Sequence, residues 1–438
     1  MNLMPVGISN QLFYFTSGGE GSAFDICFRF ACAAPPDREK LCQAIRATLK
    51  HFPEFALRPA IRGNAVWGMP NENEVPLLDD DGSILHYGTE ETAGYLFAFR
   101  CSGAGFSFSY FHGLADFHGI WCFLRTLFYH YALEQGLSVP PDDFVRLDAA
   151  QMVSADEQER LDPYRRFAPV GDDALPPPDL SDAFALPEDF YDDDVPYCTS
   201  YEIRTPLKDF LAAAKERQTS VSALLSLLAA RAVAGLYDRS GKPIRIMTSA
   251  DMRKYYGAET MVNFSDAVFL DYDDTISGLP FTEQAGRLRA ALKAQMSKEH
   301  FDPLLLQKTK TVQGWLRSGL PITEWNRRFR EPPPKNVMTI ALTYPGSLDL
   351  PPAYQPLVRE ITRDICILGA KVFGLSVMTF GGTMYIRSSQ RFASDAIMRG
   401  MERELGALGL QTDFSGLEPY RGNLVLTERF AQLGTVHK

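Results

Sequence analysis

The stretch from Phe106 to Leu133 constrains the fold more than any other part of this 438-residue chain. Phe106–Phe111 is typical of a buried strand, and Gly119–Leu133 is typical of an apolar helix. Between them lie two polar residues four positions apart, His112 and Asp116. Placing a polar pair in such apolar surroundings is costly unless the pair has partners or a task. We therefore look for chemistry at this strand end.

The spacing of the pair alone allows two interpretations. A neutral imidazole with a pKa near 6.5 is suited to take a proton from a hydroxyl or an amine, with Asp116 orienting the site or pairing with an arginine. Alternatively, His112 is a satisfied, partly buried histidine and Asp116 caps the helix. Both interpretations stay open at this point.

Composition excludes several classes of protein. A formal charge of −10 and the absence of a basic stripe argue against a nucleic-acid partner. The seven cysteines lack CxxC spacing and lie mostly in apolar sequence, which predicts buried, reduced thiols and a cytoplasmic protein. The longest apolar run, Val221–Leu236, contains Arg231 and is too short to span a bilayer, so we expect a buried helix there.

The order of elements suggests two similar halves. Residues 1–153 form the first, residues 199–438 the second, and the Asp- and Pro-rich stretch 154–198 is the predicted linker. Each half opens with a strand, a proline-containing break and an amphipathic helix. In the first half these are Ala23–Phe30, Pro35–Asp37 and Arg38–Leu49, and in the second Thr199–Arg204, Thr205–Pro206 and Leu207–Arg217.

Further strands are expected where short apolar or alternating runs lie between turn residues. These are Asn64–Gly68, Tyr95–Arg100, Ile244–Ala250, Ala267–Tyr272, Val337–Thr343, Leu375–Thr379 and Thr383–Arg387. Gly381–Gly382 predicts a hairpin between the last two. Asp395–Leu408 is expected to be the final helix.

Several segments, taken in order, resemble one known superfamily. FHGLAD, at 111–116, is similar to the HxxxD motif of the chloramphenicol acetyltransferase-like acyltransferases, which include condensation domains, BAHD acyltransferases and alcohol acetyltransferases. The segments RATLKHFPEFALR, SADMRKYYGAETMVNF, ALTYPGSLDLPPAY and GLSVMTFGGTMYIR resemble other conserved parts of that superfamily. The resemblance implies an α/β (α+β) fold of two lobes, each a mixed sheet flanked by helices, with a channel between them.

The resemblance also implies roles for individual residues. His112 would be the general base and Asp116 a structural residue bound to an arginine, for which Arg253 in ADMRK is the match. Breaking such a partly buried pair costs about 3–5 kcal/mol. Asn263 of the NF pair would lie where the lobes meet, or act as an ordinary turn asparagine.

The sequence departs from the superfamily pattern at several positions. Phe117 stands where a glycine usually follows the aspartate, and Phe111 stands where condensation domains commonly carry a second histidine. Thr343 and Tyr344 replace a Ser-Asn pair, so a hydroxyl of one of them would have to replace any oxyanion donor at the asparagine. Candidates for lining the substrate channel are Phe117, His118, Ser376 and Thr379.

Metal and thiol chemistry are both disfavoured by the sequence. His112, Asp116 and His118 could form an H-x3-D-x-H ligand set, but three ligands within seven residues need unusual backbone geometry and no second ligand cluster is visible. Cys122 near His118 lies in apolar sequence and is expected to be part of the core.

The resemblance implies an acyltransferase that uses acyl-CoA as co-substrate and needs no permanently bound cofactor. A small-molecule hydroxyl or amine would be the acceptor. Arg253, Lys254 and Lys371 are candidates for binding the CoA phosphates, and we expect a monomer. Two alternatives remain: a stand-alone condensation domain that takes its acyl group from a carrier protein, and a catalytically silent member that binds a ligand or partner.

Overall fold

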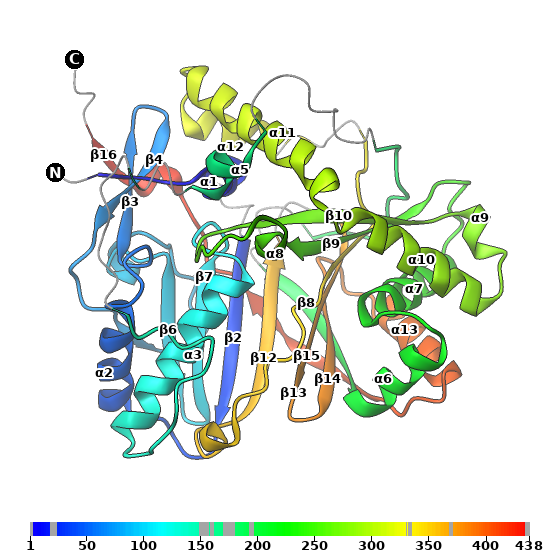
Figure 1. Cartoon of the computed structure of the whole chain (residues 1–438), viewed down its shortest axis with the longest axis horizontal. Coiled ribbons are helices and arrows are strands. Elements are labelled where there is room, and N and C mark those ends of the chain that lie inside the picture. Colours follow the sequence, from blue (N-terminus) through cyan, green and yellow to red (C-terminus); the bar gives the residue numbers. More distant parts are fainter. Residues whose placement is uncertain are drawn as a thin grey trace.

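The computed structural model describes residues 3–17, 24–148, 157, 162–169, 180–191, 197–329, 331, 335–367 and 371–433. Within these residues the strands form three mixed sheets, and the two larger sheets are the centres of two lobes (Figure 1). The predicted α/β architecture, two lobes each built on a mixed sheet with flanking helices, is confirmed. No helix in the described part of the chain is long and apolar enough to cross a membrane.

The N-terminal lobe is built on a five-stranded sheet in the order β12-β2-β7-β6-β5. Its own strands are β2 (Phe24–Cys32), β5 (Leu77–Asp79), β6 (Phe97–Ser102) and β7 (Gly105–Phe111). Because side chains alternate along a strand, Phe28 and Phe30 of β2 share one face with Phe106, Phe108 and Tyr110 of β7. The helices α2 (Arg38–Leu49) and α3 (Phe117–Glu134) lie on that face, where Phe123 and Phe128 of α3 meet Phe108 and Phe30.

The C-terminal lobe is built on a seven-stranded sheet in the order β10-β9-β11-β13-β14-β8-β15. The strands are β8 (Tyr197–Pro206), β9 (Ile244–Asp251), β10 (Ser265–Tyr272), β11 (Ile340–Thr343), β13 (Phe373–Phe380), β14 (Thr383–Ser389) and β15 (Asp413–Arg421). The hairpin predicted at Gly381–Gly382 joins β13 to β14, and both glycines have positive φ. The buried helix predicted from the apolar run is α7 (Val221–Ala234). It packs against α13 (Ala396–Ala407), and α6 (Leu207–Glu216) and α10 (Phe281–Gln295) also contact it.

A strand from the second half of the sequence completes the sheet of the first lobe. β12 (Val358–Ile367) pairs antiparallel with β2, so that Ile361 lies opposite Phe30 and Ile365 opposite Ile26. Figure 1 shows β12 between β2 and the strands of the C-terminal lobe. The strand was not predicted, because its sequence VREITRDICI carries charged residues at its centre. The two sheets therefore do not separate at the predicted boundary near residue 199.

A smaller sheet with nearby helices adjoins both lobes. Its order is β1-β4-β3-β16, formed by β1 (Met4–Pro5), β3 (Leu57–Arg62), β4 (Ala65–Pro70) and β16 (Ala431–Leu433). The helix α1 (Ile8–Thr16) contacts α11 (Lys298–Arg317) and α12 (Ile322–Phe329). The remaining short helices are α5 (Pro163–Phe167), α8 (Arg253–Tyr256) and α9 (Asp274–Ser277).

The described parts of the predicted linker 154–198 are packed onto the rest of the molecule. Tyr164 of α5 is fully buried and donates a hydrogen bond to the carbonyl of Ser265. The carboxylate of Asp162 accepts a hydrogen bond from the amide of Ile8 in α1. Phe184 is part of the C-terminal core. Residues 154–156, 158–161, 170–179 and 192–196 of this stretch lie outside the described part of the chain.

Candidate active site at His112

The chain places His112 directly after β7 and holds its backbone. The amide of His112 donates to the carbonyl of Phe24 in β2 at 2.7 Å. A tight turn follows, in which the amide of Leu114 donates to the carbonyl of Phe111 at 2.8 Å. The imidazole ring stacks on the ring of Phe13 from α1, with centroids 4.5 Å apart and planes inclined by 18°. These contacts fix both the backbone and the plane of the ring.

The surroundings of His112 keep it neutral. The side chain is partly buried, and its Nδ1 is buried without a hydrogen-bond partner among the described residues. Desolvation lowers the pKa of His112, and the charge of Arg363 lowers it further. Its own carbonyl, Asp116 and Asn263 act in the opposite direction but do not outweigh the desolvation. A histidine with a lowered pKa is unprotonated at neutral pH, as a general base must be.

Asp116 has a structural role next to His112, because its carboxylate binds backbone amides and an arginine. It is the N-cap of α3, and its Oδ1 accepts a hydrogen bond from the amide of Gly119 at 3.4 Å. Its Oδ2 accepts from the amide of Phe264 at 2.8 Å. Arg253 donates to both oxygens, from Nη1 to Oδ2 at 2.8 Å and from Nη2 to Oδ1 at 2.9 Å. Asp116 is thus both the helix cap and the partner of Arg253.

Arg253 has a hydrogen-bond partner for each of its five N–H groups. Besides Asp116, it reaches Asp251 at 3.0 Å and the carbonyls of Thr260 and Val262 at 2.8 and 2.7 Å. Burial disfavours the charged form, but the two carboxylates outweigh this effect and raise the pKa of Arg253. The guanidinium therefore has no N–H left for a CoA phosphate, and the suggestion that Arg253 binds one is wrong.

The loop held by Arg253 connects the second half of the chain to the end of β7. Asn263 in this loop is 2% exposed, and its Nδ2 donates to the carbonyl of His112 at 2.8 Å. It therefore lies where the lobes meet. The loop approaches α3 so closely that a Cβ on Gly119 would lie 1.9 Å from the carbonyl oxygen of Met261. This contact explains the glycine at 119, two positions after the place where the superfamily usually has one.

Phe117, His118 and Cys122 lie on the first turns of α3. The ring of Phe117 stacks on Trp121 with centroids 6.0 Å apart. His118 Nε2 lies 3.8 Å from Cys122 Sγ, and burial lowers the pKa of His118. Among the described residues, no group of three or more His, Cys, Asp or Glu side chains could hold a metal ion.

Arg363 in β12 is a site residue that the sequence analysis missed. It is 5% exposed, its Nε donates to Ser376 Oγ at 2.9 Å, and its Nη2 donates to Thr343 Oγ1 at 2.6 Å. Two of the candidate residues, Thr343 and Ser376, are thus brought together by an arginine. The available signal was a charged residue at the centre of an otherwise alternating segment.

The other two candidates lie differently. Thr379 is three residues after Ser376 on β13, so its side chain points to the opposite face of the strand. Its hydroxyl is buried and has no partner among the described residues. Tyr344 follows β11, is partly buried against the C-terminal core, and has a pKa raised by this burial.

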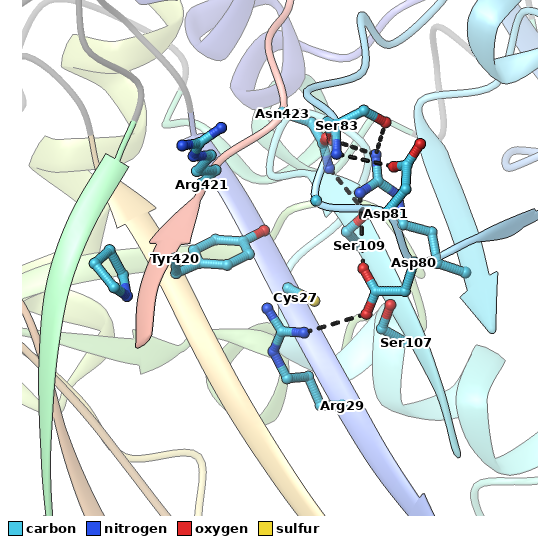
Figure 2. Close-up of a pocket in the computed structure, with 13 residues that line it drawn as sticks. Cys27, Arg29, Asp80, Asp81, Ser83, Ser107, Ser109, Tyr420, Arg421 and Asn423 are labelled. Atoms are coloured by element: carbon cyan, nitrogen blue, oxygen red, sulfur yellow. Dashed lines mark hydrogen bonds and ion pairs between the residues drawn. The ribbon is translucent and has the colours of Figure 1, made fainter. Parts of the chain in front are cut away.

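A polar pocket lies on the face of β2 and β7 that points away from α3. Figure 2 shows Tyr420 and Arg421 of β15 on one side of it and Asp80 and Asp81 on the other, with Cys27 and Arg29 of β2 between them. Its volume is about 360 Å³, and Arg29 lies 3.7 Å from Asp80 within it. A second pocket of about 320 Å³ shares Arg29 and Asp80 with it. His112 lines neither pocket.

Comparisons with known proteins identify the fold. No protein-family model matches the chain, and no curated protein matches its sequence. Solved structures match over nearly the whole length. Polyketide synthase associated protein 5 from Mycobacterium tuberculosis is 15% identical with a TM-score of 0.62, covering 92% of this chain and 97% of that one. The chain has the chloramphenicol acetyltransferase-like condensation fold.

Two further matches carry functional information about the proteins concerned. F. sporotrichioides TRI101, solved with coenzyme A and T-2, is 14% identical with a TM-score of 0.60 and covers 94% of this chain and 100% of that one. The condensation domain of the Monacolin K polyketide synthase MokA is 12% identical with a TM-score of 0.53, and the match covers 93% of this chain and 96% of that one. The resemblance inferred from the HxxxD segment is therefore confirmed for the fold.

Proposed function

We propose that the protein is an acyltransferase that moves an acyl group from a thioester to a hydroxyl or amine of a small molecule. His112 is the general base, and acyl-CoA is the thioester donor. The observation that carries the proposal is the neutral, rigidly held imidazole at the end of β7. Its ring is fixed by Phe13, and its backbone is fixed by Phe24 and Asn263.

General-base action needs an unprotonated ring nitrogen on His112, and we assign this role to Nε2. The carbonyl of His112 itself and the side chain of Asn263 raise the pKa of the imidazole, but desolvation outweighs them and keeps the ring neutral. Nδ1 is buried and so is closed to an acceptor, and we therefore place the proton on Nδ1 and the reactive lone pair on Nε2. Nε2 then removes the proton of the acceptor as it attacks the thioester carbonyl, and returns that proton to the leaving thiolate.

Asp116 and Arg253 act through position rather than by contact with the substrate. Together they fix the start of α3 and the loop that carries Asn263. The CoA phosphates require positive charge at the surface, and we assign this role to Lys254 and Lys371, which are both exposed. The structure with coenzyme A among the matches of the same fold supports the choice of donor.

A second candidate function is condensation with a carrier-protein thioester. The match to the MokA condensation domain favours it, since the fold is the same. In such a reaction His112 would do the same work, and only the source of the acyl group would differ. Phe111 in place of a second histidine is the residue that argues against it.

The test is release of free thiol from a panel of acyl-CoAs in the presence of alcohols and amines. We expect His112→Ala to lower the rate by ~10²–10⁴-fold, which is the usual contribution of a general base. His130→Ala is the matched control, because this histidine is also partly buried and lies near the other end of α3. It should retain most of the activity.

Three outcomes would change the proposal. Thiol release that is unaffected by His112→Ala would remove the general base. Transfer from an acylated carrier protein, with none from any acyl-CoA, would establish the condensation function. Binding of a ligand without any transfer would show that the protein is a silent member of the fold.

A further inference from the structure

Arg363 is a buried cation for which the described part of the fold supplies no anion. It lies at the centre of β12, opposite Phe28 of β2, and is 5% exposed. Its acceptors are the hydroxyls of Ser376 and Thr343 and, at 3.4 Å, the carbonyl of Thr343. No carboxylate of the described residues forms an ion pair with it. An unpaired buried charge is expensive, so a fold that keeps one has a use for it.

Part of the guanidinium remains open. Nε and Nη2 are used by Ser376 and Thr343, whereas Nη1 has no hydrogen-bond partner among the described residues. Desolvation lowers the pKa of Arg363 to about 10, so it stays charged at neutral pH. The hydroxyls that accept from Nε and Nη2 fix the plane of the guanidinium but do not neutralise its charge. Nη1 is therefore held in place and can donate to an anionic partner.

Arg363 lies on the sheet near the end of β7 that leads to His112: it is opposite Phe28 of β2, and Tyr110 of β7 is opposite Ile26 of β2. The charge of Arg363 acts on both His112 and Tyr110, the last aromatic residue before the turn on the same face of β7. Thr343 and Ser376 belong to β11 and β13 of the C-terminal lobe, while β12 belongs to the sheet of the N-terminal lobe. The guanidinium thus spans the junction at which His112 also lies.

We infer that Arg363 binds a carboxylate of the substrate, so that the protein acts on a carboxylate-bearing donor or acceptor. The inference rests on the proposed function and names the substrate class of the same site. The carboxylate can come from the acyl chain, as in a dicarboxylic acyl-CoA, or from the acceptor, as in an amino or hydroxy acid. In both cases it would accept hydrogen bonds from Nη1 and neutralise the buried charge.

The experiment has two arms that distinguish these sources. In the donor arm, thiol release is measured with succinyl-CoA against butyryl-CoA, which have four-carbon acyl chains and differ by one carboxylate. In the acceptor arm, acetyl-CoA is held constant and a panel of amino and hydroxy acids is compared with their methyl esters. We expect preference for the carboxylate form in one of the two arms.

The variants show whether Arg363 causes the preference. Arg363→Met should reduce the ratio of kcat/KM for the carboxylate form to that for the neutral form by about 10- to 100-fold, the usual effect of hydrogen bonds to a charged group. Arg363→Lys keeps the charge and should restore part of the ratio. Arg359→Met is the matched control, since it removes an exposed arginine from the same strand.

A binding measurement separates this inference from the proposed function. Succinyl-CoA and butyryl-CoA are titrated into the protein and into Arg363→Met, and the acids and their esters likewise, without turnover. Carboxylate-selective binding that is lost in Arg363→Met supports the inference even if no thiol is released, in which case acyl transfer fails. Transfer that depends on His112 but shows no selectivity in either arm overturns the inference and leaves acyl transfer standing. An equal loss of kcat on charged and neutral substrates in Arg363→Met also overturns it.

Discussion

Two buried arginines near His112 have opposite surroundings. Arg253 is 6% exposed and has two carboxylate partners, Asp116 and Asp251, which raise its pKa. Arg363 is 5% exposed, its partners among the described residues are hydroxyls and a carbonyl, and burial lowers its pKa. A charge that is balanced within the fold holds the site together. A charge that is left unbalanced is available to a ligand.

The largest expected effect is on stability when Arg253 loses its buried partner. Asp116→Ala leaves the guanidinium of Arg253 buried against fewer anions and also removes the cap of α3, so we expect a loss of about 3–5 kcal/mol. Urea unfolding followed by circular dichroism measures it. Asp251→Ala is the control: that side chain is 50% exposed, and its loss should cost about 1 kcal/mol or less. Equal losses in both variants would show that burial does not decide how much each carboxylate partner of Arg253 contributes to stability.

A buried carboxylate without an arginine gives a second contrast with Asp116. Asp25 is 1% exposed and accepts hydrogen bonds from the hydroxyls of Tyr87 and Tyr420 and the amide of Asn423. Desolvation raises its pKa from 3.8 to about 6 despite these bonds. The folded state therefore holds this proton more tightly than the unfolded chain, and the stabilisation present at low pH is lost as pH rises through about 6.

The size of this effect follows from the difference between the two pKa values, about 3 kcal/mol between pH 3.8 and pH 7. We expect the free energy of unfolding of the native protein, relative to Asp25→Asn, to fall by up to this amount between pH 4 and pH 7. Urea unfolding at both pH values measures it. A difference between the two proteins that does not change with pH would mean that Asp25 titrates normally.

The sequence analysis predicted the positions of three site residues and the pairing of two of them, but it missed a buried charge of the site. His112, Asp116 and Arg253 lie in local patterns, so their strand end, cap and pairing could be inferred from FHGLAD and ADMRK. Arg363 could not be found in this way, because its importance depends on β12 joining the sheet of the other lobe. A strand that crosses between lobes leaves no local signal, since its partners are more than 300 residues away.

The same limit applies to the channel candidates. Ser376 and Thr379 are equivalent in the sequence, but the alternation along β13 directs only Ser376 toward Arg363. Phe117 differs from the glycine expected at its position, and the structure shows that the close approach occurs at Gly119 instead. Helix starts were also shifted: α3 begins at Phe117 rather than Gly119, because Asp116 caps it.

The smallest expected effect is on the pH dependence of activity. Activity requires neutral His112, so kcat/KM should rise with pH through an apparent pKa below 6.5. Arg363→Met removes a positive charge that lowers the pKa of His112. The pH at which kcat/KM rises should therefore increase, by less than about one pH unit. Asp116→Asn removes a negative charge that raises the pKa of His112, so the pH at which kcat/KM rises should decrease. Movement in the same direction for both variants would contradict the electrostatic description of the site.

The most direct test of the central claim compares the two arginines by one measurement, the free energy of urea unfolding at pH 7 of Arg253→Met and Arg363→Met. Methionine removes the charge of each and keeps much of its apolar volume. We predict that Arg253→Met loses about 3–5 kcal/mol, since it leaves Asp116 as an unpaired buried carboxylate. Arg363→Met should lose about 1 kcal/mol or less, or gain stability, because it removes a buried charge that no anion balances. Losses of equal size would show that Arg363 is as much a part of the structure as Arg253, and would contradict the claim that its charge is kept for a ligand.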